Sequence, residues 1–170
     1  MAHLCVENSK LIQGIDFGEQ SEVNRLIADP ENHCVVLYPG PAASDIGMHR
    51  GSLGEKNLVV FVIDGTWSCA GKMLRRSANL ARLPQICFTP EHKSEYQIRV
   101  QPEAHCLSTL EAVHRVLELL DPSLNPGNML DVFRGMVAMQ LRYAQLNRIR
   151  KVTERSSSLP KAPSPRLSQS

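Results

Sequence analysis

Apolar residues gather in two continuous runs in the first half of the chain, at residues 34–38 and 58–63. Each run is short, rich in β-branched residues and followed by glycine or proline, which is typical of a buried strand. Shorter apolar or alternating segments predict three more strands, at residues 11–12, 85–88 and 96–100. The pattern therefore predicts a sheet built from short strands.

Between these runs, apolar residues recur every three or four positions, as they do along one side of an amphipathic helix. Ser108 and Glu111 form a capping-box pattern, in which each side chain can bond the backbone N–H of the other residue. The long stripe near the C-terminus consists of Leu130, Phe133, Val137, Leu141 and Ala144. We expect helices at residues 19–28, 68–80, 109–120 and 128–151.

Strands that alternate with helices predict the α/β class with a mostly parallel sheet flanked by helices. A chain of 170 residues is long enough for one such domain, which we place at residues 1–151. Residues 152–170 form a basic tail rich in Ser and Pro, and we expect disorder from Ser156 onward. The chain has neither a Gly-x-Gly-x-x-Gly motif after a strand nor a P-loop, so the commonest nucleotide-binding signatures are missing.

Positive charge is concentrated at the C-terminus, although the formal net charge of the chain is only +2. Residues 142–170 hold seven cations against Glu154 alone, which gives this part +6 and the rest of the chain −4. Such a segment can follow the phosphates of a nucleic acid. A basic tail that is only a solvated end is the alternative.

Composition also bears on the compartment of the protein and on metals. No apolar stretch approaches the roughly 20 residues that cross a bilayer, and the N-terminus lacks the pattern of a secretory signal. The five cysteines contain no Cys-x-x-Cys pair, so neither a disulfide framework nor a zinc site is indicated. We expect a cytoplasmic protein without a metal or membrane segment, in which the cysteines are buried as small apolar residues.

The turn after the second apolar run carries the strongest candidate chemistry. Asp64, Gly65, Thr66 and Trp67 follow this strand and precede a predicted helix, and ligands of open α/β sheets bind where strands pass into helices. Structural roles are the alternatives: Asp64 or Thr66 could cap the helix, and Trp67 could fill the core. Asp64 is the first residue to examine in the structure.

Four short motifs in this order resemble the DTW-domain family. They are Leu37-Tyr38-Pro39-Gly40, Ile63-Asp64-Gly65-Thr66-Trp67, Tyr96-Gln97-Ile98-Arg99 and Cys106-Leu107-Ser108-Thr109-Leu110-Glu111-Ala112. Each motif alone is weakly specific, whereas four in the family's order are a strong signal. The resemblance extends from about residue 4 to 150. Many family members carry an upstream cysteine-rich segment and a further strand that have no counterpart in this chain.

The resemblance implies a SPOUT-like fold with a C-terminal trefoil knot, and an aminocarboxypropyltransferase. Such an enzyme moves the 3-amino-3-carboxypropyl group of S-adenosylmethionine (SAM) to N3 of a uridine in tRNA and releases methylthioadenosine. In this chemistry Asp64 fits the general base that removes the N3 proton. The residues expected to bind the cofactor are Leu37, Tyr38, Pro39, Gly40, Asp64, Gly65, Thr66, Trp67, Ser108, Thr109 and Glu111.

Four basic residues are candidates for contact with the RNA backbone: Lys72, Arg75, Arg76 and Arg99. The first three share one surface of the predicted helix at residues 68–80, where they would attract phosphates. A solvated helix face is the alternative. Three other functions stay open: transfer of the same group to ribosomal RNA, SAM-dependent RNA methylation, and RNA binding without catalysis.

Overall fold

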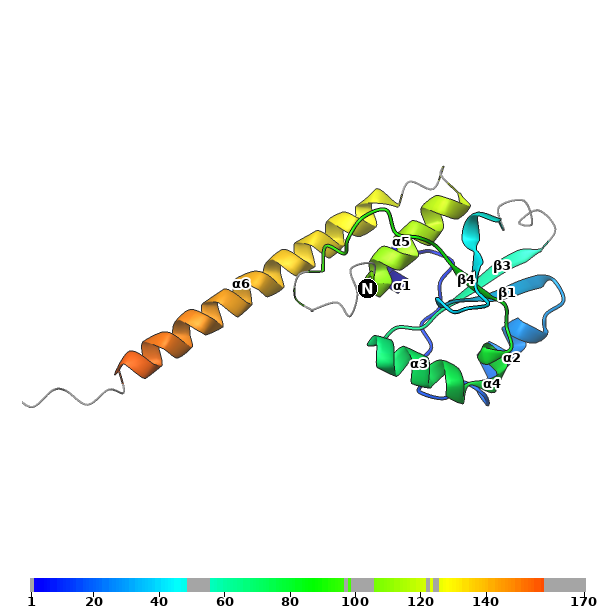
Figure 1. Ribbon diagram of the computed structural model, residues 1–170, viewed down its shortest axis with the longest axis horizontal. Coiled ribbons are helices and arrows are strands. Elements are labelled where there is room, and N and C mark those ends of the chain that lie inside the picture. Colours follow the sequence, from blue (N-terminus) through cyan, green and yellow to red (C-terminus); the bar gives the residue numbers. More distant parts are fainter. Residues whose placement is uncertain are drawn as a thin grey trace, which may run out of the picture.

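The computed structural model has a small, entirely parallel sheet at its centre, which confirms the expected α/β class (Figure 1). It describes residues 2–48, 56–96, 98, 106–121, 123 and 126–157, without the side chains of 127 and 149–157. Within these ranges the strands are β1 (Asn32–Leu37), β2 (Ser44–Asp45), β3 (Asn57–Val62) and β4 (Gln85–Cys87). They lie in the order β2-β4-β1-β3.

The register of the strands brings their carboxyl ends to one edge of the sheet. Leu37 at the end of β1 lies opposite Val62 at the end of β3 and opposite Ile86 of β4. The segments that follow the three strands therefore start side by side. This places the residues after Leu37 close to the turn at Asp64.

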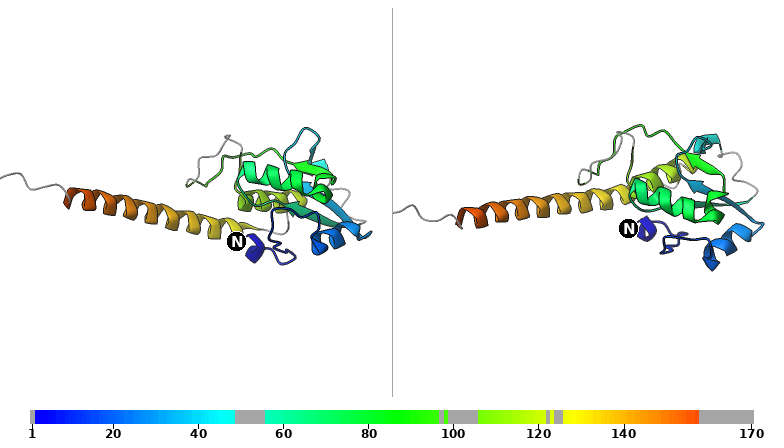
Figure 2. Two further views of the ribbon diagram at one scale, coloured as in Figure 1. Left: turned by 90° about the horizontal axis from the view of Figure 1, so that it is seen from below. Right: turned by 60° about the horizontal axis from the view of Figure 1, so that its bottom comes forward.

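Helices cover both faces of the sheet (Figures 1 and 2). Val36 faces a core that includes Val23 of α2 (Ser21–Ala28), Leu74 of α3 (Trp67–Arg76) and Leu80 of α4 (Ala78–Ala81). Its neighbour Val35 faces the opposite core with Val116 of α5 (Thr109–Leu120). Because successive side chains of a strand point to opposite faces, one apolar run supplies both cores. A short helix, α1 (Ala2–Cys5), lies near α5.

The helix predicted at residues 68–80 is broken in two at Ser77, which corrects that prediction. The side chain of Ser77 is completely buried. Its hydroxyl donates to the carbonyl oxygen of Met73 at 2.8 Å and accepts from the backbone N–H of Phe17 at 3.0 Å. A serine that bonds backbone groups in this way competes with regular helix geometry. The break ties the N-terminal segment to the end of α3.

Three other predicted elements differ from the structure. No strand forms at Leu11 and Ile12, where the described backbone is irregular, and the first long helix starts at Ser21 rather than at Glu19. Of the strand predicted at residues 96–100, Tyr96 and Ile98 lie outside any strand, and the rest lies outside the described residues. No apolar or alternating pattern in the sequence predicts β2, which has only two residues and pairs with β4 alone.

The last helix, α6 (Gly127–Ser157), has 31 residues and extends past the predicted end at Lys151. Its first turns pack Met129, Phe133 and Val137 against Leu110 of α5. From residue 142 to residue 148 every side chain is exposed, and the helix projects away from the sheet (Figures 1 and 2). Neither this helix nor another in the described part of the chain is apolar enough over its length to cross a membrane. Disorder is expected from Ser156 onward, but Ser156 and Ser157 belong to α6, which corrects the prediction at these two positions. The rest of this segment, residues 158–170, lies outside the described residues.

The five cysteines are free thiols. Cys34 and Cys106 are buried and Cys87 is half-buried, in agreement with the expectation of small apolar core residues. Cys5 and Cys69 are exposed, so for these two the expectation is wrong. Cys69 lies in the first turn of α3, on the part of the helix that is exposed next to the turn after β3.

Candidate active site

A cavity of about 1120 Å³ lies at the carboxyl edge of the sheet. Its walls come from the segments after β1, β3 and β4, the N-termini of α3 and α5, and one side of α6. The predicted cofactor residues that line it are Leu37, Tyr38, Pro39, Asp64, Gly65, Thr66, Trp67, Ser108 and Thr109. Residues far apart in the sequence thus meet at the edge that open α/β sheets use for ligands.

Asp64 is held by a hydrogen bond from a residue 45 positions later in the chain. The hydroxyl of Thr109, the first residue of α5, donates to Oδ1 of Asp64 at 2.7 Å. The other carboxylate oxygen has no hydrogen bond within the described part of the chain, and the side chain is exposed. The carboxylate is therefore fixed on one side and accessible on the other.

Thr66, and not Asp64, caps α3. The Thr66 side chain accepts from the backbone N–H of Cys69 at 3.3 Å and lies 3.2 Å from the hydroxyl of Ser68. This decides between the two capping alternatives, because the Asp64 carboxylate is turned toward α5 instead. Asp64 is thus free of the structural role that would best explain a carboxylate at this turn.

Trp67 does not fill the core. Its side chain is 37% exposed and lines the cavity, where its ring centroid lies 6.4 Å from that of Tyr38 at an angle of 53°. Gly71, one turn further along α3, leaves room for this arrangement, since a Cβ there would lie 3.0 Å from the Tyr38 hydroxyl oxygen. Two aromatic rings therefore border the cavity on the side of α3.

Gly40 and Glu111 are the two predicted cofactor residues that do not line the cavity. A Cβ on Gly40 would lie 2.5 Å from Oε1 of Gln85, so the close approach at this glycine is to a neighbouring side chain. Gly65 does line the cavity, and a Cβ there would meet only ordinary contacts, the nearest at 3.5 Å.

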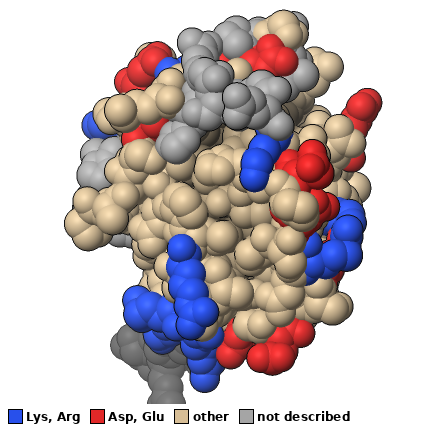
Figure 3. All heavy atoms as spheres, turned by 90° about the vertical axis from the view of Figure 1, so that its right-hand side faces the viewer, with Lys and Arg blue, Asp and Glu red and all other residues tan. Residues whose placement is uncertain are grey.

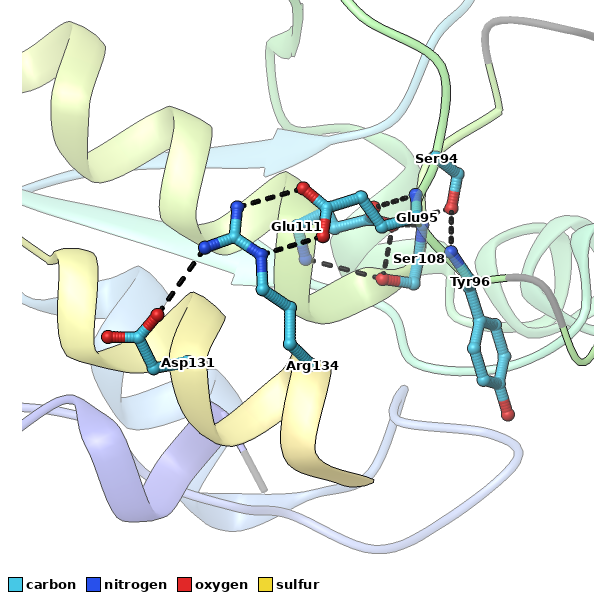
Figure 4. A network of polar contacts seen from close by, with 7 residues as sticks. All are labelled: Ser94, Glu95, Tyr96, Ser108, Glu111, Asp131 and Arg134. Carbon is cyan, nitrogen blue, oxygen red and sulfur yellow. Dashed lines mark hydrogen bonds and ion pairs between the residues drawn. The ribbon is translucent and has the colours of Figure 1, made fainter. Parts of the chain in front are cut away.

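The Glu111 carboxylate is used within the protein (Figure 4). It accepts from the backbone N–H of Ser108 at 2.8 Å, and the Ser108 side chain accepts from the backbone N–H of Glu111 at 3.4 Å, which confirms the predicted capping box. The Ser108 hydroxyl also donates to the Glu111 carboxylate, at 2.6 Å. The same carboxylate accepts from the Ser94 hydroxyl at 2.7 Å and from the Glu95 N–H at 2.6 Å. With 8% of its surface exposed, Glu111 anchors the loop at residues 94–96 to the start of α5.

An ion pair fastens the same loop to α6. The guanidinium of Arg134 donates to both carboxylate oxygens of Glu95, at 2.7 and 2.9 Å (Figure 4). The hydrogen bonds from Arg134 hold the pKa of Glu95 below its usual value. Next to this pair, Tyr96 lines the cavity and its ring packs 5.8 Å from that of Phe133. Loop 94–96 is therefore a wall of the cavity with two attachments.

Sequence reasoning missed part of the lining. Phe88 and Pro90 after β4, and Phe133 and Met136 of α6, also border the cavity. Periodicity places Phe133 only in the packing stripe of its helix, since it shows which side of a helix is buried and not what that side faces. No pattern in the sequence distinguishes a residue that packs in the core from one that also faces a ligand.

The Cys69 thiol is an exposed group beside the site. The pKa of Cys69 lies below its usual value, chiefly because of the hydrogen bond with the Thr66 side chain, with a contribution from the charge of Lys72. Cys69 does not line the cavity.

Lys72, Arg75 and Arg76 are exposed on α3, and none of them forms an ion pair with another described residue. The fourth candidate, Arg99, lies outside the described residues. Figure 3 shows one face of the molecule, on which Lys and Arg side chains gather at the lower left, next to a group of Asp and Glu side chains. The described residues hold no group of three or more His, Cys, Asp or Glu side chains placed for a metal ion.

The sequence model of the protein family described as the DTW domain matches residues 1–141 of the chain. The chain belongs to the DTW-domain family. The match includes every residue of the cavity named above and the first part of α6. Beyond residue 141 the helix continues outside the matched DTW domain.

Relatives of this DTW domain are named tRNA-uridine aminocarboxypropyltransferase 2. The protein from Mus musculus is 29% identical over 140 residues, which are 81% of this chain and 47% of the relative. Those from Macaca fascicularis and Drosophila melanogaster are 25% and 34% identical over 88% and 59% of this chain, and over 51% and 39% of their own lengths. The chain thus spans about half the length of these relatives or less. No solved structure matches it.

Proposed function

We propose that this DTW domain transfers the 3-amino-3-carboxypropyl group of SAM to N3 of a uridine in tRNA. The observation that carries the proposal is the Asp64 carboxylate, held by Thr109 at 2.7 Å and accessible on its other side at the wall of a large cavity. The names of the relatives support the same reaction and the same class of RNA.

Asp64 acts as the general base of this reaction. A carboxylate within reach of the uridine N3 takes its proton as the bond between N3 and the transferred carbon forms. The electron pair of the broken carbon–sulfur bond stays on sulfur, and methylthioadenosine leaves as a neutral molecule. SAM supplies the positively charged sulfur that makes this leaving group effective. Orientation of the two reactants by the cavity can contribute several kcal/mol.

The residues around the cavity fit SAM as a ligand. Trp67 and Tyr38 present ring faces and edges to a planar base, and Leu37 and Pro39 supply apolar wall next to them. The N-termini of α3 and α5 open toward the cavity, and this end of a helix favours a carboxylate. We assign the adenine to the aromatic side and the carboxylate to the helix ends.

Exposed cations on α3 extend the site toward RNA. Lys72, Arg75 and Arg76 lie on the helix whose N-terminus borders the cavity, and they have no acidic partner among the described residues. Unpaired cations beside a cavity attract phosphates and speed encounter with RNA. The proposal also includes the SPOUT-like relationship of the fold, its trefoil knot and a cytoplasmic location.

The Asp64→Asn variant tests the proposal. With SAM and unmodified tRNA, we expect wild-type protein to yield aminocarboxypropyl-uridine and methylthioadenosine, measured by mass spectrometry of nucleosides and products. Asp64→Asn keeps the size of the side chain and removes the base, so transfer should fall by about 10²–10⁴-fold while calorimetry still detects SAM binding.

Glu31→Gln is the matched control, because it removes a carboxylate at the opposite end of β1, next to Asn32. It should transfer at the wild-type rate. Formation of S-adenosylhomocysteine would instead identify a methyltransferase. If neither methylthioadenosine nor S-adenosylhomocysteine formed, the domain would be an RNA-binding module without catalysis. Ribosomal RNA modified in preference to tRNA would correct the substrate. Near-normal turnover by Asp64→Asn would refute the role of Asp64.

A further inference from the structure

Helix α6 lines the cavity near its N-terminal end and is exposed to solvent further along. Phe133 and Met136 line the cavity, and Arg134 holds the loop that carries Tyr96. From residue 142 to residue 148 the side chains are exposed, and the helix continues to Ser157 without turning back (Figures 1 and 2). A ligand of the projecting half is therefore linked to the cavity by one continuous helix.

The projecting half is strongly basic. The sequence of residues 142–157 contains five cations, Arg142, Arg148, Arg150, Lys151 and Arg155, and one anion, Glu154. Arg142 and Arg148, whose side chains are described, are exposed and form no ion pair with another described residue. Among the described residues the fold uses neither the charge of Arg142 nor that of Arg148, so an external polyanion is the partner that these two cations fit.

We propose that residues 142–157 of α6, the basic arm, bind the phosphate backbone of the same RNA whose uridine enters the cavity. The inference rests on the proposed function and adds a second contact region to it. With a rise of about 1.5 Å per residue, Arg148 lies about 18 Å along the helix from Met136. At about 3.4 Å per nucleotide of a stacked strand, the arm reaches phosphates at least about five nucleotides from the target.

An exposed apolar stripe on the same helix suggests one competing occupant. Met139, Tyr143 and Leu146 are 60%, 62% and 52% exposed and follow each other at helical spacing, as in a surface that pairs with a second copy of the chain. Pairing of two arms in parallel would bring the five cations of each arm close to the five of the other, which costs energy. RNA neutralises these charges, and the Tyr143 ring can stack on an unpaired base.

The test compares two double variants that each remove two positive charges. Arg142→Gln/Arg148→Gln changes the arm and retains good helix formers. Lys10→Gln/Arg25→Gln is the matched control, because both cations lie in the N-terminal part of the chain, far from the arm in sequence, where they pair with Glu22. Fluorescence anisotropy then measures the dissociation constant of a full-length tRNA and of a uridine-containing tetranucleotide at several salt concentrations, and calorimetry measures SAM binding.

We expect the arm variant to bind tRNA about tenfold more weakly, with a salt slope lower by about 1.4–1.8 because two phosphate contacts are lost. Its affinity for the tetranucleotide and for SAM should equal that of wild type, since neither ligand reaches the arm. The control variant should bind all three ligands as wild type does. Circular dichroism checks that the helix content is unchanged.

Equal tRNA affinity and salt slope in the arm variant and wild type would overturn the inference. So would an equal loss in the control variant, which would indicate only a general effect of charge. Sedimentation that shows a dimer broken by Tyr143→Ser, without any change in RNA affinity, would assign the helix to a second copy. If tRNA binding depends on the arm but no aminocarboxypropyl-uridine forms, the proposed function is refuted and RNA binding by the arm is retained. If transfer occurs and tRNA binding does not depend on the arm, only the inference about the arm is refuted.

Discussion

At the scale of single residues, the bond between Thr109 and Asp64 joins the two motifs that the site depends on. Asp64 follows β3, Thr109 starts α5, and their side chains meet at 2.7 Å. A carboxylate on an exposed turn would otherwise sample several rotamers, only some of which face the cavity. Thr109 is thus a positioning residue for the proposed base.

Replacement of Thr109 tests this role. Thr109→Val keeps the shape of the side chain and removes the donor, so the turnover number should fall by about tenfold or more while the dissociation constant of SAM changes little. Thr109→Ser restores a hydroxyl and should recover most of the rate. A variant that lost SAM affinity and turnover in equal measure would place Thr109 in cofactor binding instead.

The sequence identified the residues of the site better than their roles. Asp64, Thr66 and Trp67 could be found because a buried strand followed by a turn and a helix start is a local pattern. That Thr66 takes the cap and leaves Asp64 to Thr109 depends on a contact 45 residues away in sequence, which no local pattern contains. Glu111 illustrates the reverse case, since its capping box was predicted and its bonds to Ser94 and Glu95 were not.

At the scale of elements, loop 94–96 depends on two helices at once. Glu111 of α5 bonds its backbone and Arg134 of α6 bonds Glu95, so the loop is fixed only when both helices are docked. The Arg134–Glu95 pair is about half exposed, and solvent screening keeps its contribution to stability small. Its importance lies in the position of Tyr96 at the cavity wall.

The charge of this pair predicts how stability depends on pH. The pKa of Glu95 is lowered from 4.5, chiefly by its hydrogen bond with Arg134, so the pair stabilises the fold above pH 4.5 and loses this effect as the pH falls through the lower folded-state pKa. Arg134→Gln should melt about 1–3 °C below wild type at pH 7. The difference should shrink toward zero in strongly acidic buffer.

Asp131→Asn is the control for this prediction, because Asp131 contacts Arg134 at a longer distance of 3.4 Å and is more exposed than Glu95. It should melt within about 1 °C of wild type. A difference between Arg134→Gln and wild type that stayed constant with pH would mean that packing of the Arg134 stem, and not the ion pair, stabilises the loop.

The elements themselves were predictable where a strong pattern decided them. The apolar runs at β1 and β3, the capping box of α5 and the stripe of α6 all correspond to observed elements. The split between α3 and α4 was not predictable, because Ser77 ends a helix only through its bond with Phe17 in a distant segment. Likewise, β2 is a strand only because β4 lies beside it.

At the scale of the whole molecule, the structure combines a packed body with a long unsupported helix. Packing of Met129, Phe133 and Val137 stabilises the start of α6, whereas residues 142–148 are exposed all round. A helix without tertiary contacts is only marginally stable in water. Stability along α6 should therefore fall from the body outward.

Hydrogen exchange measures this gradient. Amides near Phe133 and Val137 should exchange slowly, and those beyond Ala144 should exchange within seconds, since local opening there costs little. Addition of full-length tRNA should slow exchange in residues 145–157, whereas a tetranucleotide should not. Uniform protection along α6 in the free protein would contradict the gradient and indicate that another surface covers the projecting half.

The strand order β2-β4-β1-β3 has a consequence for how the chain folds. No strand of this sheet pairs with the strand next to it in sequence, so no hairpin can nucleate it, and each pairing closes a long loop. Sheets of this kind form more slowly than bundles of helices. During synthesis β1 and β3 can pair early, but β2 has no partner until Cys87 has left the ribosome. Until that moment the nascent chain exposes an unpaired edge, which makes this interval the one in which a chaperone would matter most.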